Sequence, residues 1–256
     1  MIDFTLGKYK ELCQTVQQKY TIYPVYEYLL QKSAGSCVVL RHDVDRNVKN
    51  SLSMARMEHD LGIRSTYYFR FPYTFHIEVI RKIHSLGHEI GYHYEVLSKT
   101  NGDLEKAISL FAEELQEFRK ISPVNTICMH GSPLSKYNNR DLWARYDYHS
   151  HGIYGEAFLS FEQTSDDFIY LTDTGRTWSG KRSLRDVMKT RSGNDEPMSL
   201  DSTDDLIRWI RYAGVRKLYL TIHPERWSEN IGEWLVWSFL DFGMNAGKEF
   251  LKWHRS

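Results

Sequence analysis

The sequence of 256 residues lacks the features that mark several common classes of protein. Its three cysteines, Cys13, Cys37 and Cys128, lie far apart, form no CxxC pair and suggest no disulfide framework. No apolar run approaches the length of a membrane-spanning helix, and no basic segment followed by an apolar core marks a secretory signal. We therefore expect reduced thiols, no transmembrane segment and a cytoplasmic location.

The sequence also has no excess of charge of either sign. Lysine plus arginine and aspartate plus glutamate number 33 each, so the formal net charge is zero when histidine is neutral. This balance provides no overall field for attracting nucleic acid, and we expect no nucleic-acid partner. The glycine patterns that cradle phosphates, GxGxxG and GxxxxGK[ST], are missing as well.

The pattern of apolar residues is that of an α/β protein with a large core. Short β-branched or aromatic runs alternate with segments whose apolar residues recur at helical spacing, which predicts a parallel sheet or barrel. The predicted strands cover residues 37–40, 65–69, 89–95, 124–129, 168–171 and 218–222, and the predicted helices cover 6–18, 24–31, 50–61, 75–86, 103–120, 138–146 and 203–212. Residues 147–167 and 177–199 are expected to be irregular.

We expect a single domain over residues 1–256. Residues 1–34 form a helical preface in this interpretation, and residues 228–256 add C-terminal helices. No low-complexity segment or clear linker divides the chain.

Reactive side chains follow five of the predicted strands. These clusters are His42–Asp45, His93–Glu95, His130–Gly131, Asp173–Gly175 and His223–Glu225. In a barrel of parallel strands the carboxyl ends open on one face, so we expect one shared site there. Aspartate, histidine and glutamate without cysteine suit Zn²⁺ or another first-row metal that keeps an open coordination position.

The first cluster contains two aspartates in alternate positions. In extended backbone Asp43 and Asp45 point to one side, and His42 and Val44 point to the other. Two adjacent carboxylates repel each other unless a cation or a shared proton lies between them. Two interpretations stay open at this point: a metal or acid–base site, or a loop pair that makes turn and cap hydrogen bonds.

In chain order, these segments resemble the motifs of the polysaccharide deacetylase family, the NodB-type carbohydrate esterases. Residues 41–45 (RHDVD) are similar to its first motif and residues 87–93 (GHEIGYH) to its second, while residues 130–133 (HGSP) take the place of the third. Asp173 with Trp178 is similar to the fourth motif, and residues 220–223 (LTIH) are similar to the fifth. The resemblance is closer still to a deacetylase-like branch found among bacterial surface-polysaccharide gene clusters. It implies a distorted (β/α) barrel, often with seven strands.

The resemblance also implies a reaction and a role for several residues. The reaction is metal-dependent removal of an acetyl group from an N-acetylated sugar or polysaccharide precursor. Asp43 matches the general base, His223 the general acid, and Asp173 the residue that orients this histidine. Asp45 and His93 match ligands of the divalent metal, which we expect to be Zn²⁺ or another first-row ion.

The third metal ligand is not settled by the resemblance. The family's second histidine ligand falls four residues after His93, where this chain has Leu97. His130 is one replacement, and Glu95 is its rival because it shares a face with His93 in extended backbone. A third option is that His130 only orients Asp43.

The expected substrate is an N-acetylated sugar, a nucleotide-sugar or a lipid-linked saccharide. Two other functions stay open. The first is metal-dependent hydrolysis of another ester, amide or phosphoester. The second is a catalytically degenerate barrel that binds a sugar or a partner, for which Leu97 is the support in the sequence.

Overall fold

The computed structural model describes residues 2–132, 135–164, 166–178, 200–212, 214–241 and 243. Its strands are β1 (Thr21–Tyr23), β2 (Cys37–Val44), β3 (Thr66–Phe69), β4 (Glu89–Tyr94), β5 (Thr126–Met129), β6 (Gly155–Glu156), β7 (Ile169–Thr172) and β8 (Lys217–Ile222). Its α-helices are α1 (Leu6–Gln17), α2 (Val25–Gln31), α3 (Val48–Asp60), α4 (Ile77–Ser85), α5 (Val96–Lys99), α6 (Leu104–Arg119), α7 (Leu159–Glu162) and α8 (Thr203–Tyr212). Short 3₁₀ helices are η1 (Asn139–Ala144), η2 (Tyr148–His151) and η3 (Pro224–Arg226).

All strand pairings are parallel, and they join the strands into one curled sheet. The order is β6-β5-β4-β3-β2-β8-β7. Strand β1 pairs with the first half of β2, and β3 pairs with the second half of β2 on the same side. Within the described residues no pairing connects β6 to β7, so the barrel is open between these two strands. This is the distorted seven-stranded (β/α) barrel that the sequence predicts, with β1 as an addition.

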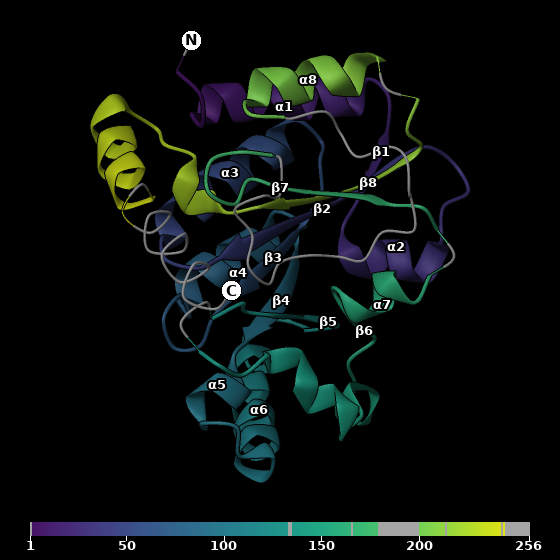
Figure 1. The fold of residues 1–256 in the computed structure, drawn as a ribbon, viewed down its shortest axis with the longest axis vertical. Coiled ribbons are helices and arrows are strands. Elements are labelled where there is room, and N and C mark those ends of the chain that lie inside the picture. The colour runs from purple at the N-terminus through teal and green to yellow at the C-terminus, as the bar shows by residue number, and fades with distance from the viewer. Residues whose placement is uncertain are drawn as a thin grey trace.

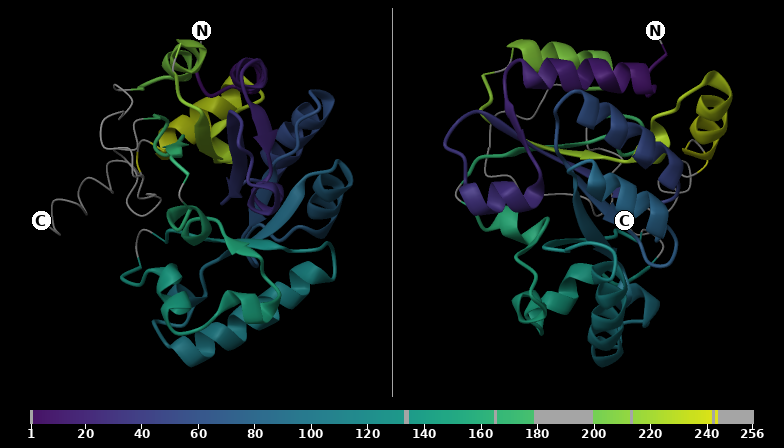
Figure 2. Two further views of the ribbon diagram at one scale, coloured as in Figure 1. Left: turned by 90° about the vertical axis from the view of Figure 1, so that its right-hand side faces the viewer. Right: turned by 180° about the vertical axis from the view of Figure 1, so that it is seen from behind.

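The helices lie outside the curled sheet (Figures 1 and 2). Helices α1 and α8 pack side by side at one end of the molecule, while α5 and α6 lie at the opposite end (Figure 1). The longest of them, α6, begins as its sequence predicts, because the Asp103 side chain accepts a hydrogen bond from the backbone N–H of Lys106. One face of α6 is buried, and its apolar residues there recur at helical spacing: Ala107, Phe111, Leu115 and Phe118.

The central strand β2 is buried along its whole length because packed groups cover both of its faces. Val39 contributes to the apolar cluster that includes β3, β4, β5 and α6, whereas Val38 and Leu40 contribute to a second cluster beneath α1 and α8. Alternation along one strand therefore connects the two halves of the core.

The structure differs from the sequence-based prediction in several places. Strand β2 continues to Val44 instead of ending at Leu40, and the helical preface contains the short strand β1. The segment expected to be irregular includes η2, β6 and α7. The expected loop at 177–199 lies outside the described residues from 179 onward, and so does the expected helical tail from 244 onward. Among the described residues, no helix combines the length and apolar character needed to cross a bilayer.

Candidate metal centre

Side chains from three separate strand ends meet around Asp45, which follows β2. The Nε2 atom of His93, on β4, is 3.3 Å from Asp45 Oδ1, and the Nε2 atom of His130, just after β5, is 3.7 Å from the same oxygen. The Nε2 atom of His223, just after β8, is 4.0 Å from Asp45 Oδ2. Asp43 joins this group through an oxygen 3.9 Å from His93 Nε2. The convergence expected of parallel strand ends is therefore present.

Each of the three imidazoles is held through its Nδ1 atom. The Nδ1 of His93 is 3.0 Å from the backbone carbonyl of Cys128, that of His130 is 2.9 Å from Glu95, and that of His223 is 2.6 Å from Asp173. Carbonyl and carboxylate oxygens only accept, so Nδ1 carries the proton and the neutral ring has its lone pair on Nε2. Metal-binding histidines are held in this way.

The pKa values of Asp45 and His93 are shifted by the charges that surround them. Burial alone would raise the pKa of Asp45, but His130, His93 and His223 hold it well below its usual range. Burial would lower the pKa of His93, and the neighbouring carboxylates of Asp43 and Asp45 outweigh it, so that pKa is raised. These opposite shifts have one cause, the close approach of carboxylates and imidazoles in a buried place.

The residues present fit a divalent metal ion. Asp43 Oδ1 and Asp45 Oδ1 are buried, and neither has a hydrogen-bond partner among the described residues. A buried carboxylate oxygen without a partner is costly, and a cation would compensate it. One carboxylate with two imidazole nitrogens is a donor set that Zn²⁺ and other first-row metals accept. The side chains of Asp45 and His130 are 16% and 13% exposed, so the group is reached from solvent on their side.

Asp173 contacts the Nδ1 side of the His223 ring, and its carboxylate accepts four hydrogen bonds. Its Oδ1 accepts from His223 Nδ1 and from Arg226 at 2.9 Å, and its Oδ2 accepts from the His223 backbone N–H at 3.0 Å and from the Trp227 indole at 2.8 Å. Burial opposes ionisation here, but Arg226 and His223 lower the pKa of Asp173 to about 2. The pKa of His223 is raised, because burial and Arg226 lower it less than Asp173 and Asp45 raise it.

Glu95 and Leu97 occupy places that bear on the third ligand. Leu97 is buried in the core on α5. Glu95 receives Arg70 on both carboxylate oxygens at 2.9 Å, and it also accepts from His130 and from Ser132. In this arrangement Glu95 holds the ring of His130, whose Nε2 is directed at Asp45.

Sequence reasoning gave Arg41 no role, yet it is the residue that contacts Asp43. Arg41 is completely buried, its Nη2 is 3.5 Å from Asp43 Oδ2, and its Nε donates to the Thr221 hydroxyl at 2.8 Å. The guanidinium lies over the ring of Phe158, 4.3 Å from its centroid. The spacing in the sequence contained this information, because residues two apart in a strand share a face.

His42 points away from this site, as alternation along β2 predicts. Its Nε2 lies 2.9 Å from Glu58 Oε1, and its ring stacks on Tyr67 with the centroids 4.1 Å apart. Glu58 also accepts from Ser65 at 2.6 Å and from Tyr9. This second polar cluster is closed by its own hydrogen bonds, and it lies between β2, α1 and α3.

No protein-family model and no curated protein matches the chain. Among solved structures, a family 4 carbohydrate esterase from Bacillus anthracis is similar at a TM-score of 0.39 and 12% identity, over 88% of this chain and 87% of that one. The peptidoglycan deacetylase PdaC from Bacillus subtilis is similar at a TM-score of 0.38 and 13% identity, over 84% of this chain and 98% of that one.

Proposed function

We propose that this protein is a metal-dependent hydrolase that removes the acetyl group from an N-acetylated sugar. The observation that carries the proposal is the group of three histidines around Asp45. Each ring is fixed through Nδ1 by a different acceptor, and each directs Nε2 toward the same carboxylate, that of Asp45. A structural hydrogen-bond network would satisfy both carboxylates. Here the Oδ1 atom of Asp43 has no hydrogen-bond partner among the described residues, and that of Asp45 has only ion-pair contacts with the histidines.

In this proposal Asp45, His93 and His130, which we name the outer group, hold the metal. When bound, the ion supplies positive charge that polarises the acetyl carbonyl and makes an attacking water easier to deprotonate. His93 and His130 come from neighbouring strands, and the Nδ1 atom of each ring is hydrogen-bonded to an acceptor on the side away from Asp45. These hydrogen bonds favour a fixed ligand geometry.

Asp43 then serves as the general base. Its Oδ2 is near Arg41 and its Oδ1 has no partner among the described residues, so one oxygen remains to take a proton from the attacking water. The Arg41 guanidinium lies 3.5 Å from the other oxygen, Oδ2, and holds this carboxylate in place.

His223 serves as the general acid that protonates the leaving amine. Asp173 accepts its Nδ1–H, so a transferable proton on this ring is the one on Nε2, at the atom that faces Asp45. Asp173 positions the ring and stabilises its protonated form.

The N-acetyl group and the sugar come from the motif resemblance. A nucleotide-sugar and a lipid-linked saccharide are the candidate forms of the substrate in this proposal. The same residues would hydrolyse an O-acetyl ester, whose leaving group needs less help from an acid. Substrate screening with matched N-acetyl and O-acetyl sugars separates these two reactions.

The direct test is acetate release by metal-loaded protein from N-acetyl sugars and nucleotide-sugars. We expect no release after chelation, and recovery of release with Zn²⁺, Co²⁺ or Mn²⁺. Asp43→Asn removes the base and should lower the rate by about 10²–10⁴. Asp60→Asn on the surface of α3 is the matched control and should retain the rate. Equal rates for Asp43→Asn and Asp60→Asn would rule out Asp43 as the base.

A further inference from the structure

A second group of ligand atoms lies one layer deeper in the barrel. Cys128 precedes His130 by two residues on β5, so its side chain shares a face with His130 but lies further inside. Its thiol sulfur, a ring nitrogen of His93 and a carboxylate oxygen of Asp43 all lie within 4.8 Å of one another. All three residues are buried. We name Asp43, His93 and Cys128 the inner group.

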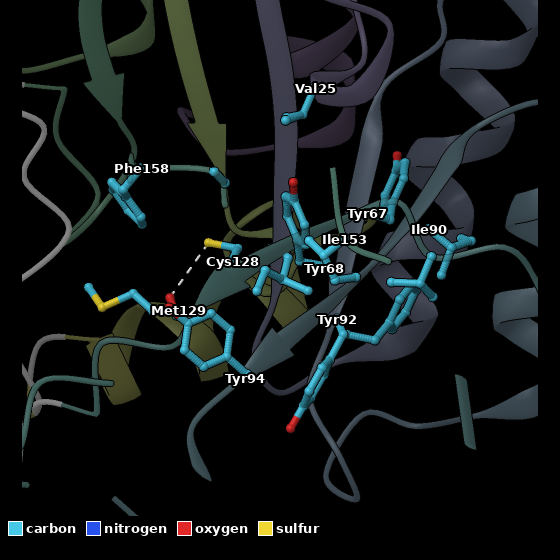
Figure 3. Close-up of a cluster of buried hydrophobic side chains, with 14 of the residues drawn as sticks. Val25, Tyr67, Tyr68, Ile90, Tyr92, Tyr94, Cys128, Met129, Ile153 and Phe158 are labelled. Carbon is cyan, nitrogen blue, oxygen red and sulfur yellow. Dashed lines mark hydrogen bonds between the residues drawn. The ribbon is translucent and has the colours of Figure 1, made fainter. Parts of the chain in front are cut away.

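The ordinary role of a buried thiol is apolar packing, and the other two cysteines, Cys13 and Cys37, are also buried. Cys128 differs in its neighbours. Figure 3 shows it among buried side chains of the barrel interior, with the thiol 3.5 Å from the carbonyl of Met129. Arg41 Nη1 donates to the sulfur at 2.7 Å, so the thiol lies in a polar contact and is not packed only against apolar groups.

The inner group also contains a carboxylate oxygen that lacks a partner. Asp43 is 2% exposed, and its Oδ1 has no hydrogen bond within the described part of the chain. A carboxylate, an imidazole and a thiolate together form a mixed donor set that soft and borderline metal ions prefer.

We propose that the inner group is a second metal position, which takes a soft divalent ion, for which Cd²⁺ is the probe. The thiol proton passes to solvent as the sulfur binds the ion, and no oxidant or reductant takes part. Arg41 stays in place as an N–H donor to the sulfur, held by Thr221 and by the aromatic faces around it.

The two positions exclude each other because both need His93. Its Nδ1–H is committed to the carbonyl of Cys128, so only Nε2 has a lone pair, and one lone pair binds one ion. The protein therefore sorts metals by softness: harder ions enter the outer group, and soft ions enter the inner group. This consequence rests on the proposed function, because an ion in the inner group removes Asp43 from its role as base.

The test of the inner group is spectroscopic and does not depend on activity. Metal-free protein is titrated with Cd²⁺ while the thiolate-to-cadmium charge-transfer absorption is recorded in the ultraviolet. We expect the band in the wild type, its loss in Cys128→Ser, and its retention in the matched control Cys37→Ser. A band that survives Cys128→Ser, or wild-type protein that binds Cd²⁺ without a band, overturns the proposal.

X-ray absorption at the cadmium edge of the wild type keeps the proposal testable if Cys128→Ser fails to fold. We expect one sulfur atom in the first coordination shell, and a shell of nitrogen and oxygen alone would overturn the proposal. The sorting of metals is measured separately, as the rate of acetate release with Cd²⁺ divided by the rate with Mn²⁺. This ratio should rise in Cys128→Ser, and an unchanged ratio refutes the sorting. If no metal supports release, the proposed function fails while the spectroscopy still decides the inner group.

Discussion

Replacing Asp173 by asparagine tests how the barrel positions His223. The carboxylate accepts four hydrogen bonds, from the side chain and backbone of His223, from Arg226 and from Trp227. An asparagine has one oxygen and one NH₂ group, so its NH₂ would face N–H groups that now donate to the carboxylate. The substitution also removes the charge of the carboxylate that pairs with the buried Arg226 at 2.9 Å.

The expected loss has two parts. Removing one partner of a buried ion pair costs about 3–5 kcal/mol, so the free energy of unfolding should fall by about that amount. A domain of this kind is typically stable by about 5–15 kcal/mol, so a folded population should remain for assay. In that population the ring of His223 is no longer fixed with its proton on Nδ1, and acetate release should fall by about 10²–10⁴.

The measurement is urea unfolding followed by the fluorescence of the buried tryptophans, together with acetate release. Asp166→Asn is the control, since the side chain of Asp166 is 27% exposed and pairs with Lys217 at 2.6 Å. The free energy of unfolding of Asp166→Asn should fall by no more than about 1 kcal/mol, and its rate of acetate release should be retained. If Asp173→Asn costs no more stability than Asp166→Asn and keeps the wild-type rate, the positioning argument is wrong.

Three further substitutions test other parts of the structure. Burial would raise the pKa of Glu58, but His42 outweighs it and the pKa is lowered from 4.5 to about 2. The ionised carboxylate therefore adds about 3 kcal/mol to the free energy of unfolding above pH 4.5, and this contribution is lost as the pH falls toward 2. Glu58→Gln should remove that part of the pH dependence of unfolding. Gly91→Ala would place a methyl group 2.2 Å from ring atoms of Tyr68, and thermal unfolding should show a loss of about 1–3 kcal/mol. Glu95→Gln should weaken metal binding by about 10–100-fold in a calorimetric titration, because His130 loses the carboxylate that orients it.

Each of these predictions has a clear contrary result. A wild-type protein and a Glu58→Gln variant whose stabilities fall in parallel between pH 4.5 and 2 would show that Glu58 is not the titrating group. Gly214→Ala is the control for Gly91→Ala, since a methyl group there meets nothing within 4 Å, and equal losses would contradict the packing argument. Unchanged metal affinity in Glu95→Gln would remove His130 from the ligand set.

The barrel and the meeting of strand ends could be predicted from the sequence because both follow from local pattern. Alternating strands and helices specify a parallel sheet, and parallel strands open their carboxyl ends on one face. The opposite directions of His42 and Asp43 followed in the same way from the alternation of side chains along β2.

The parts that were missed depend on contacts between distant segments. The predicted strand ended with the apolar run at Leu40. Strand β2 continues through Arg41, which is buried where an aspartate, a threonine and aromatic faces surround it. Strands of two or three residues, such as β6 and β1, have too little pattern to be recognised. Cys128 looked like ordinary core until the register of β4 and β5 placed it opposite His93.

The most direct test of the central claim is an anomalous-difference map, recorded at the zinc edge from crystals of zinc-loaded protein. The account predicts a peak within bonding distance of Asp45, His93 and His130. Zinc bound at other residues, or no peak among these three in crystals that contain zinc, would contradict it.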